Sequence, residues 1–265
     1  VQLAREWGPA EGEAGGCGGA GAFVAARLGR GGRPLRVLVP GCGTGRLAFD
    51  CACALPAGSA VEALDSSYAS LVACRGVLLN AGEHQHRWRV RPNLLADPQG
   101  RPLAARSAAV SLRCPSLARA LHGSSRLHLL FGDFLAGDFP TEFRRGSAAT
   151  ADSTASSGCY DAVVTVYVLD AVPSLPLALR KVAALLRPGG LWLYCGANPL
   201  RYLHPNAGHF TWEEVLSLLP AAGLQLVEEE SFREEYVPGS GRLDAVRCLC
   251  CRRVPSEVSQ PPVSG

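Results

Sequence analysis

Short apolar runs alternate with stretches of helical periodicity along most of the chain. The runs are rich in Val and Leu, which is typical of strands that are buried on both faces of a parallel sheet. Strands are predicted at 35–41, 60–65, 127–134, 160–170, 191–196, 224–237 and 245–254. Helices are predicted at 21–29, 46–55, 67–80, 176–190 and 211–223. Thr211 and Glu214 form a capping-box pattern at the start of the last helix.

This order predicts an α/β fold with a doubly wound, mostly parallel seven-stranded sheet and an antiparallel closing strand. Ligands bind such sheets at the carboxyl ends of the strands, where the strand order reverses. We expect a helical cap at 1–30 that contributes to the site, a main domain at 31–253 and a disordered tail at 254–265. Within the main domain, 81–125 reads as an insertion that could form a lid or an oligomer contact, and 144–158 reads as a low-complexity loop.

Composition narrows the class of protein. The 265 residues are 48% hydrophobic, enough for one large core, and the net charge is only +3. No dense Lys/Arg run, long apolar stretch or signal peptide is present, so we expect no nucleic-acid or membrane partner and a cytoplasmic, also nuclear, location. The sequence leaves the oligomeric state open, and a homodimer is one of the alternatives. The chain has no Met and begins at Val1, so we expect it to be a piece of a longer protein.

The eleven cysteines are spread over apolar segments. A core of this size needs no disulfide staples, so we expect reduced thiols that act as small apolar residues. Zinc is the alternative at Cys248, Cys250 and Cys251. No His pair or second Cys pair stands at ligand spacing, so no metal site is predicted.

The strongest local signal is the Gly loop of Gly41, Gly43 and Gly45, which follows a strand and precedes a helix. Glycines let backbone N–H groups approach a ligand closely, without a Cβ in the way. A tight turn without a ligand is the alternative. Dinucleotide-binding loops have a further glycine at a fixed spacing, and this loop lacks it. An NAD-dependent oxidoreductase is therefore a weaker alternative.

Three carboxylates follow predicted strands. Asp65 could accept hydrogen bonds from two ribose hydroxyls, or could cap the next helix. Asp133, beside Phe134, could bind the amino group of an adenine while the aromatic ring stacks on it, or could belong to an ordinary turn. Asp170 could orient an amine or imidazole nucleophile, or could cap the helix that follows.

These residues resemble the class I methyltransferases, and more narrowly the carnosine N-methyltransferase (N2227-like) family. The resemblance covers roughly 1–253 and rests on five motifs in family order: LAREWGPAEGEAGGC, VLVPGCGTGRLA, LHLLFGDF, YDAVVTVYVLDA and LLRPGGLWLYCG. It implies an enzyme that uses S-adenosyl-L-methionine to methylate an imidazole of a small His-containing peptide, as in the conversion of carnosine to anserine.

The resemblance also implies roles at the cofactor end. Gln2 and Arg5 would lie near the methionine carboxylate, and Val166, where the family often has Cys, would contribute a backbone contact. Asp65 stands where the family has Glu. The cofactor-binding residues implied are Gln2, Arg5, Gly41, Gly43, Gly45, Asp65, Asp133, Phe134 and Val166.

At the substrate end, the resemblance assigns Asp170 as the substrate-binding and catalytic acid and Tyr167 as an aromatic pocket residue. The family places a His soon after the fifth strand, where this chain offers both Tyr202 and His204 at a different spacing. His204 and Tyr236 are candidates to bind the substrate's carboxylate or amine. The family's Tyr cluster before the last strand is replaced by LDAVRC at 243–248. Two other readings stay open: a methyltransferase of a protein histidine or another amine, and a non-catalytic module that keeps the fold.

Overall fold

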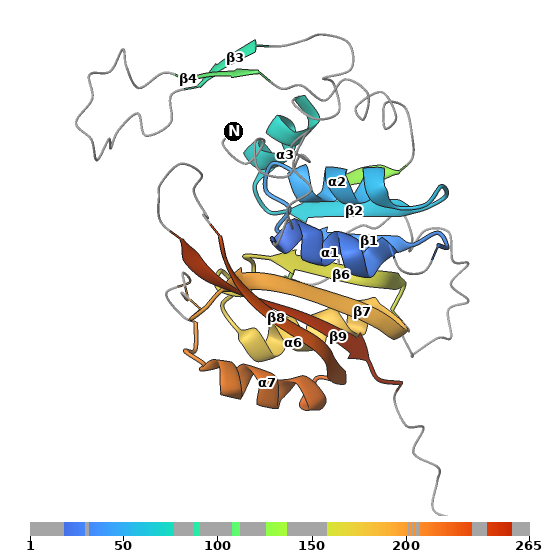
Figure 1. Cartoon of the computed structure of the whole chain (residues 1–265), viewed down its shortest axis with the longest axis vertical. Helices are drawn as coiled ribbons and strands as arrows, with labels where there is room; N and C mark the ends of the chain where they lie inside the picture. Colours follow the sequence, from blue (N-terminus) through green and yellow to red (C-terminus); the bar gives the residue numbers. More distant parts are fainter. Residues whose placement is uncertain are drawn as a thin grey trace, which may run out of the picture.

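A seven-stranded mixed sheet forms the centre of the protein (Figure 1). The computed structural model describes residues 19–29, 32–76, 126–136, 158–200, 202, 204, 207–234 and 243–255, and the backbone of 87–90 and 108–111. The strands of this sheet are β1 Arg36–Pro40, β2 Ala60–Asp65, β5 Leu127–Phe131, β6 Tyr160–Val166, β7 Leu186–Ala197, β8 Leu224–Glu234 and β9 Asp244–Arg253. The helices are α1 Ala20–Leu28, α2 Arg46–Ala54, α3 Tyr68–Cys74, α6 Leu175–Leu185 and α7 Trp212–Ala221.

The strand order is β5-β2-β1-β6-β7-β9-β8. The first five strands are parallel, and β9 pairs antiparallel with both β7 and β8. This confirms the predicted doubly wound sheet with an antiparallel closing strand. The order reverses between β1 and β6, so the carboxyl ends of these two strands define the crevice where such sheets bind ligands.

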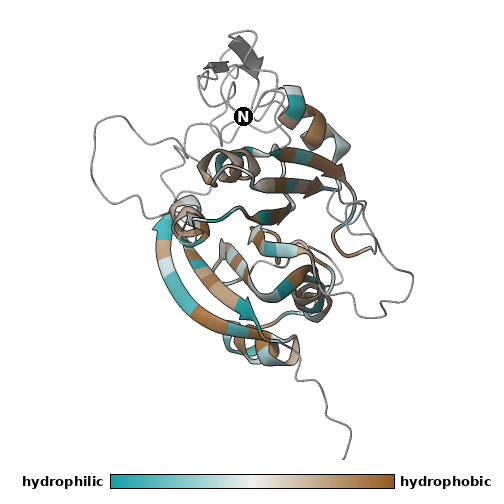
Figure 2. Cartoon of the chain, turned by 90° about the vertical axis from the view of Figure 1, so that its right-hand side faces the viewer, coloured by the Kyte–Doolittle hydropathy of each residue, from teal (hydrophilic) through white to brown (hydrophobic). Residues whose placement is uncertain are grey.

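Two hydrophobic cores cover the two faces of the sheet. Alternation along β1 sends Val37 and Val39 to the core beneath α1 and α2, and Leu38 to the core beneath α6 and α7. In Figure 2 the central strands are mostly hydrophobic, whereas the curved edge strand carries much of the hydrophilic surface. The sheet is therefore a rigid platform, and its carboxyl edge can hold side chains in fixed positions.

The helix predicted at 176–190 is wrong at its end. Helix α6 stops at Leu185, and β7 begins at Leu186. Pro188 disfavours a helical conformation at the residue before it, so the chain leaves the helix early. The strand then bulges, because its pairing with β6 shifts register between Tyr160 and Ala162.

The expectation that all cysteines are reduced is wrong for one pair. Cys195 and Cys248 form a disulfide, and their Cα atoms are 4.2 Å apart at directly opposite positions of β7 and β9. The other described cysteines are free and are buried or half-buried, as expected for small apolar residues.

The insertion at 81–125 contributes a separate two-stranded antiparallel sheet, β3 Arg87–Val90 with β4 Ala108–Ser111. The remainder of the insertion, all but the last residue of the loop predicted at 144–158, and residues 256–265 of the predicted tail lie outside the described residues. No helix in the described part of the chain is both long and apolar enough to cross a membrane.

Candidate functional site

The Gly loop turns sharply between β1 and α2 at the sheet's carboxyl edge. Gly41, Gly43 and Gly45 have φ angles of 62°, 55° and 80°, a region that other residues enter only at a cost. A Cβ on Gly41 would lie 2.7 Å from Cγ2 of Val168, whereas a Cβ on Gly43 would meet nothing within 4 Å. Gly41 is therefore required for packing, and Gly43 turns its backbone toward open space that a ligand can fill.

Asp65 at the end of β2 braces this loop. Its Oδ2 accepts a 2.7 Å hydrogen bond from the backbone N–H of Gly43, and its Oδ1 accepts one of 2.7 Å from the N–H of Ser67. Asp65 is not the helix cap, because the side chain of Ser67 caps α3 by accepting from the N–H of Ser70. Each carboxylate oxygen has more than one acceptor site, so Asp65 can hold the loop and still accept from ribose hydroxyls.

Cys42, inside the loop, has no nucleophilic role at neutral pH. Burial, followed by the negative charge of Asp65, raises the pKa of its thiol to about 12. The thiol therefore stays protonated and acts as an apolar side chain.

The turn after β5 joins the same edge. The N–H of Gly132 donates to the backbone oxygen of Asp65 at 3.1 Å, which fixes Asp133 close to the end of β2. Asp133 is exposed, and one of its oxygens accepts from the N–H of Leu135 at 2.8 Å. Phe134 is only 7% exposed and packs in the core, and its contact with the cofactor stays a prediction. Phe134 anchors the turn that presents Asp133.

The sequence interpretation missed two exposed aromatic residues beside these acids. Tyr68 opens α3, three positions after Asp65, and Phe131 ends β5, two positions before Asp133. Their rings are 69% and 58% exposed and meet edge to face, with centroids 6.0 Å apart. Solvent-exposed rings between two carboxylates suit a flat heteroaromatic group. The only sequence signal was their spacing from the acids, since Tyr68 also fits a helical apolar stripe.

Tyr167 and Asp170 follow β6 on the other side of the crevice. Tyr167 has a φ of 53°; its N–H donates to the oxygen of Cys195 and its hydroxyl donates to Oε1 of Glu234, both at 2.8 Å. Asp170 is only 5% exposed. It does not cap α6, because Ser174 does so.

Tyr194 on β7 is affected by the charge of Asp170. Burial and then the charge of Asp170 raise the pKa of the Tyr194 phenol well above its usual value. A Cβ on Gly196 would lie 2.0 Å from the Tyr194 hydroxyl oxygen, so the phenol tip lies over the glycine at the carboxyl end of β7. Tyr194 and Asp170 are both buried, at 1% and 5% exposed, and they interact electrostatically. Val166, at the end of β6, is half-buried and pairs with Cys195.

Tyr202 stabilises the loop that follows β7. The Tyr202 hydroxyl donates to the oxygen of Phe210 at 2.6 Å and accepts from its N–H at 2.7 Å, and the ring stacks on His209. His204 is half-buried in this loop, and its backbone oxygen accepts from Ala207. Substrate binding by His204 stays a prediction.

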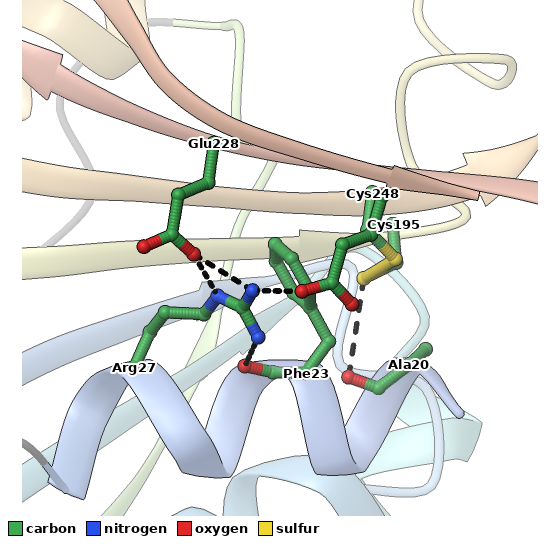
Figure 3. Close-up of polar contacts among 7 residues, drawn as sticks. Ala20, Phe23, Arg27, Cys195, Glu228 and Cys248 are labelled. Atoms are coloured by element: carbon green, nitrogen blue, oxygen red, sulfur yellow. Dashed lines mark hydrogen bonds and ion pairs between the residues drawn. A yellow bond between two sulfur atoms is a disulfide. The ribbon is translucent and has the colours of Figure 1, made fainter. Parts of the chain in front are cut away.

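Helix α1 packs beside α2 and β6, and Arg27 links it to β8 (Figure 3). Arg27 forms ion pairs with Glu228 and Glu230 and lies over the ring of Phe23, with 3.7 Å between the guanidinium carbon and the ring centroid. At the other end of the helix, a Cβ on Gly19 would lie 3.5 Å from Oε2 of Glu234.

Three predicted site residues, Gln2, Arg5 and Tyr236, lie outside the described residues. Their roles stay predictions. The remaining candidates lie at the ends of β1, β2, β5 and β6 or in the loops that follow them, except His204, which lies in the loop after β7.

Comparison with known proteins agrees with this architecture. Residues 26–246 match the family model of carnosine N-methyltransferase. The carnosine N-methyltransferase unmet of Drosophila melanogaster is 27% identical over 177 residues, which cover 64% of this chain and 32% of that protein. The carnosine N-methyltransferase of Schizosaccharomyces pombe is 25% identical over 224 residues, which cover 77% of this chain and 53% of that protein. The chain thus spans about a third to a half of the length of these relatives.

Solved structures show the same fold. An S-adenosylmethionine-dependent methyltransferase from Mesorhizobium loti aligns with a TM-score of 0.52 and 14% identity, covering 89% of this chain and 99% of that chain. The fold is that of the class I methyltransferases. Together with the family match, it implies S-adenosyl-L-methionine as the cofactor.

Proposed function

Because the chain belongs to the carnosine N-methyltransferase family, we propose that it transfers a methyl group from S-adenosyl-L-methionine to an imidazole nitrogen of a small, carnosine-like histidine peptide. The observation that carries the proposal is the arrangement of Gly43, Asp65 and Asp133 on one edge of the sheet. An open glycine backbone and two carboxylates at neighbouring strand ends match the needs of a nucleoside with an amino acid tail.

At the cofactor end, we assign each described residue a task. The Gly loop would face the amino acid part, Asp65 the ribose hydroxyls and Asp133 the adenine amino group, with Tyr68 and Phe131 beside the ring. The backbone of Val166 would approach the cofactor from β6. Gln2 and Arg5 would complete the site from the segment before α1.

At the acceptor end, the bound cofactor supplies an electrophilic methyl group, and the protein has to present a neutral nitrogen in line with it. Asp170 would accept a hydrogen bond from the imidazole N–H, which fixes the tautomer and leaves the other nitrogen's lone pair free. Its charge would stabilise the positive charge that develops on the ring. Positioning of this kind can lower a barrier by several kcal/mol, on the order of 7 or more in well-aligned cases.

One observation favours a second candidate, methylation of a protein histidine or another amine. Leu243 precedes β9, and Asp244 and Ala245 begin it, in the region where the resemblance leads us to expect a cluster of tyrosines. The aromatic lining for a free dipeptide is therefore reduced in this chain, and a larger acceptor would supply contacts of its own.

The test is methyl transfer from labelled S-adenosyl-L-methionine to carnosine, to free histidine and to a histidine-containing protein extract. We expect labelled carnosine in the wild type and at least a hundredfold loss in Asp170→Asn, with binding of S-adenosylhomocysteine retained. Asp161→Asn, which alters a carboxylate at the opposite end of β6, serves as the control. Label only in protein would favour the second candidate, and full activity of Asp170→Asn would refute the assigned role of Asp170.

A further inference from the structure

Arg247 brings a positive charge to the carboxyl end of β7. It lies on β9 directly opposite Gly196, the glycine beneath the tip of the Tyr194 phenol. Burial and then the charge of Asp170 raise the pKa of that phenol, and the charge of Arg247 opposes the rise. Asp170 and Arg247 therefore both lie within electrostatic range of one hydroxyl, the first as an acid and the second as a cation.

Aromatic rings limit where the guanidinium of Arg247 can lie. Its central carbon is 5.1 Å from the centre of the Trp212 ring, a distance at which the face of an indole attracts a cation. Trp212 is the first residue of α7, and its ring lies 5.6 Å from that of Tyr194, centroid to centroid. Arg247 is thus held next to two buried rings from α7 and β7.

This cluster has more hydrogen-bond donors than acceptors. The Nε–H of Arg247 and the indole N–H of Trp212 are both buried, and neither donates to any acceptor among the described residues. Nε of Arg247 lies 3.2 Å from Oε1 of Glu229, which makes an ion pair but no hydrogen bond. Buried donors without a partner are rare in folded proteins, because each loses its hydration without compensation. Two of them on stacked side chains favour a ligand that brings acceptor oxygens.

A carboxylate is the group that fits these donors best. A guanidinium carries five N–H donors in a planar fork and binds a carboxylate through two parallel hydrogen bonds. The Arg247 side chain is 22% exposed, so the protein does not seal it off, and its partner Glu229 is 31% exposed. Partly exposed ion pairs are weak, so Glu229 leaves the guanidinium able to bind a second carboxylate.

We propose that Arg247 binds the carboxylate of the methyl acceptor while Asp170 holds its imidazole, so that the acceptor is a histidine with a free carboxylate, as at the C-terminus of a small peptide. The inference rests on the proposed function and narrows the substrate class at the same site. A C-terminal histidine carries an imidazole and a carboxylate on one residue, whereas a histidine inside a protein chain has no carboxylate of its own.

The position of Arg247 in the sequence supports this assignment. It belongs to the segment 243–248, in which the expected cluster of tyrosines is absent. A charged contact from this segment would compensate for the smaller aromatic lining of the acceptor site. The amine of the peptide is then left to the two other candidates, His204 and Tyr236.

Carnosine amide is the matched probe for this assignment. It keeps the imidazole and the amine of carnosine and replaces the carboxylate by an uncharged amide. We expect the wild type to methylate carnosine with a kcat/KM about 10–100-fold above that for carnosine amide, the size of charged hydrogen bonds. The difference should lie mainly in KM, because the carboxylate takes no part in the transfer of the methyl group.

Three variants assign the preference to a residue. Arg247→Gln should reduce the preference for carnosine to within about threefold and change the kcat/KM for carnosine amide by no more than about threefold. Arg247→Lys keeps the charge but loses the planar fork, so it should keep an intermediate preference. Arg252→Gln is the control, because Arg252 is exposed near the other end of the same strand, and it should behave like the wild type. Binding of S-adenosylhomocysteine should stay within twofold in all three.

The outcomes separate this inference from the proposed function. If the wild type methylates carnosine and carnosine amide equally well, the inference is overturned and the proposed function stands, a result that needs no variant. An unchanged preference in Arg247→Gln would also overturn the inference, because another group would then bind the carboxylate. If the wild type methylates neither compound, the inference fails together with the proposed substrate. Equal losses toward both compounds in Arg247→Gln would count against it, since they would indicate general damage to the fold.

Discussion

Gly41→Ala places a methyl group 2.7 Å from Cγ2 of Val168 at a backbone φ of 62°. Two terms oppose the change. A left-handed conformation costs a residue with a Cβ about 1–2 kcal/mol, and an extra methyl in a packed site adds about 1–3 kcal/mol. We expect Gly41→Ala to lower the free energy of unfolding by about 2–5 kcal/mol, the sum of these two terms.

Alanine substitutions at Gly32 and Gly43 separate the conformational cost from the packing cost. Gly32 and Gly43 have φ angles of 59° and 55°, and a Cβ on either meets nothing within 4 Å. Each alanine variant should therefore lose only the conformational term of about 1–2 kcal/mol. Urea unfolding measures all three variants, with the slope of each transition checked for change. A Gly41→Ala variant as stable as Gly32→Ala would refute the crowding against Val168.

The same variants test what fills the space at Gly43. Gly32 lies before β1, away from the loop, so Gly32→Ala should bind S-adenosylhomocysteine like the wild type. Gly43→Ala should match Gly32→Ala in stability but bind the ligand at least tenfold more weakly, because its methyl group enters the space assigned to the cofactor. Equal affinities in Gly43→Ala and Gly32→Ala would contradict that assignment.

Three further predictions concern the frame around the site. Tyr160→Phe removes a hydrogen bond to the buried carboxylate of Glu62 and should destabilise the protein by about 1.5–3 kcal/mol in urea; a loss below about 0.5 kcal/mol, the range of neutral surface changes, would contradict the buried contact. Thr211→Ala removes half of the capping box of α7 and should lose about 1 kcal/mol, with exposed Glu213→Ala as the unaffected comparison. Because burial raises the Cys42 thiol pKa from 9.0 to about 12, its contribution to stability is complete below pH 9 and falls as the pH rises toward 12. Cys42→Ala should therefore flatten part of the alkaline loss of stability measured between pH 9 and 12, and an unchanged profile would count against a buried thiol.

The sequence predicted the elements well where pattern and local chemistry agree. The apolar runs around Val37 and Val163 are buried strands, and the Thr211–Glu214 capping box opens α7 as expected. These features depend on neighbours along the chain, which the sequence displays directly. The alternation of strands and helices then leaves few topologies, and the doubly wound order follows.

The errors arise where a contact across the fold decides the outcome. Cys195 and Cys248 can pair only because the register of β7 and β9 sets them opposite each other, and a sequence does not display register. The packing of Phe134 in the core likewise depends on residues from other elements, which its own motif does not reveal. Glu234 has no local motif, since only the fold brings β8 to the end of β6.

The most direct test of the cofactor site is calorimetric titration of S-adenosylhomocysteine into the wild type, Asp65→Asn and Asp161→Asn. We predict one site in the wild type and a loss of about 10–100-fold in Asp65→Asn, the size of charged hydrogen bonds to the ribose and to the N–H of Gly43. Asp161→Asn, at the opposite end of the sheet, should bind like the wild type. Absence of binding by the wild type, or equal affinity in Asp65→Asn, would contradict the account of the Gly loop and Asp65 as the cofactor site.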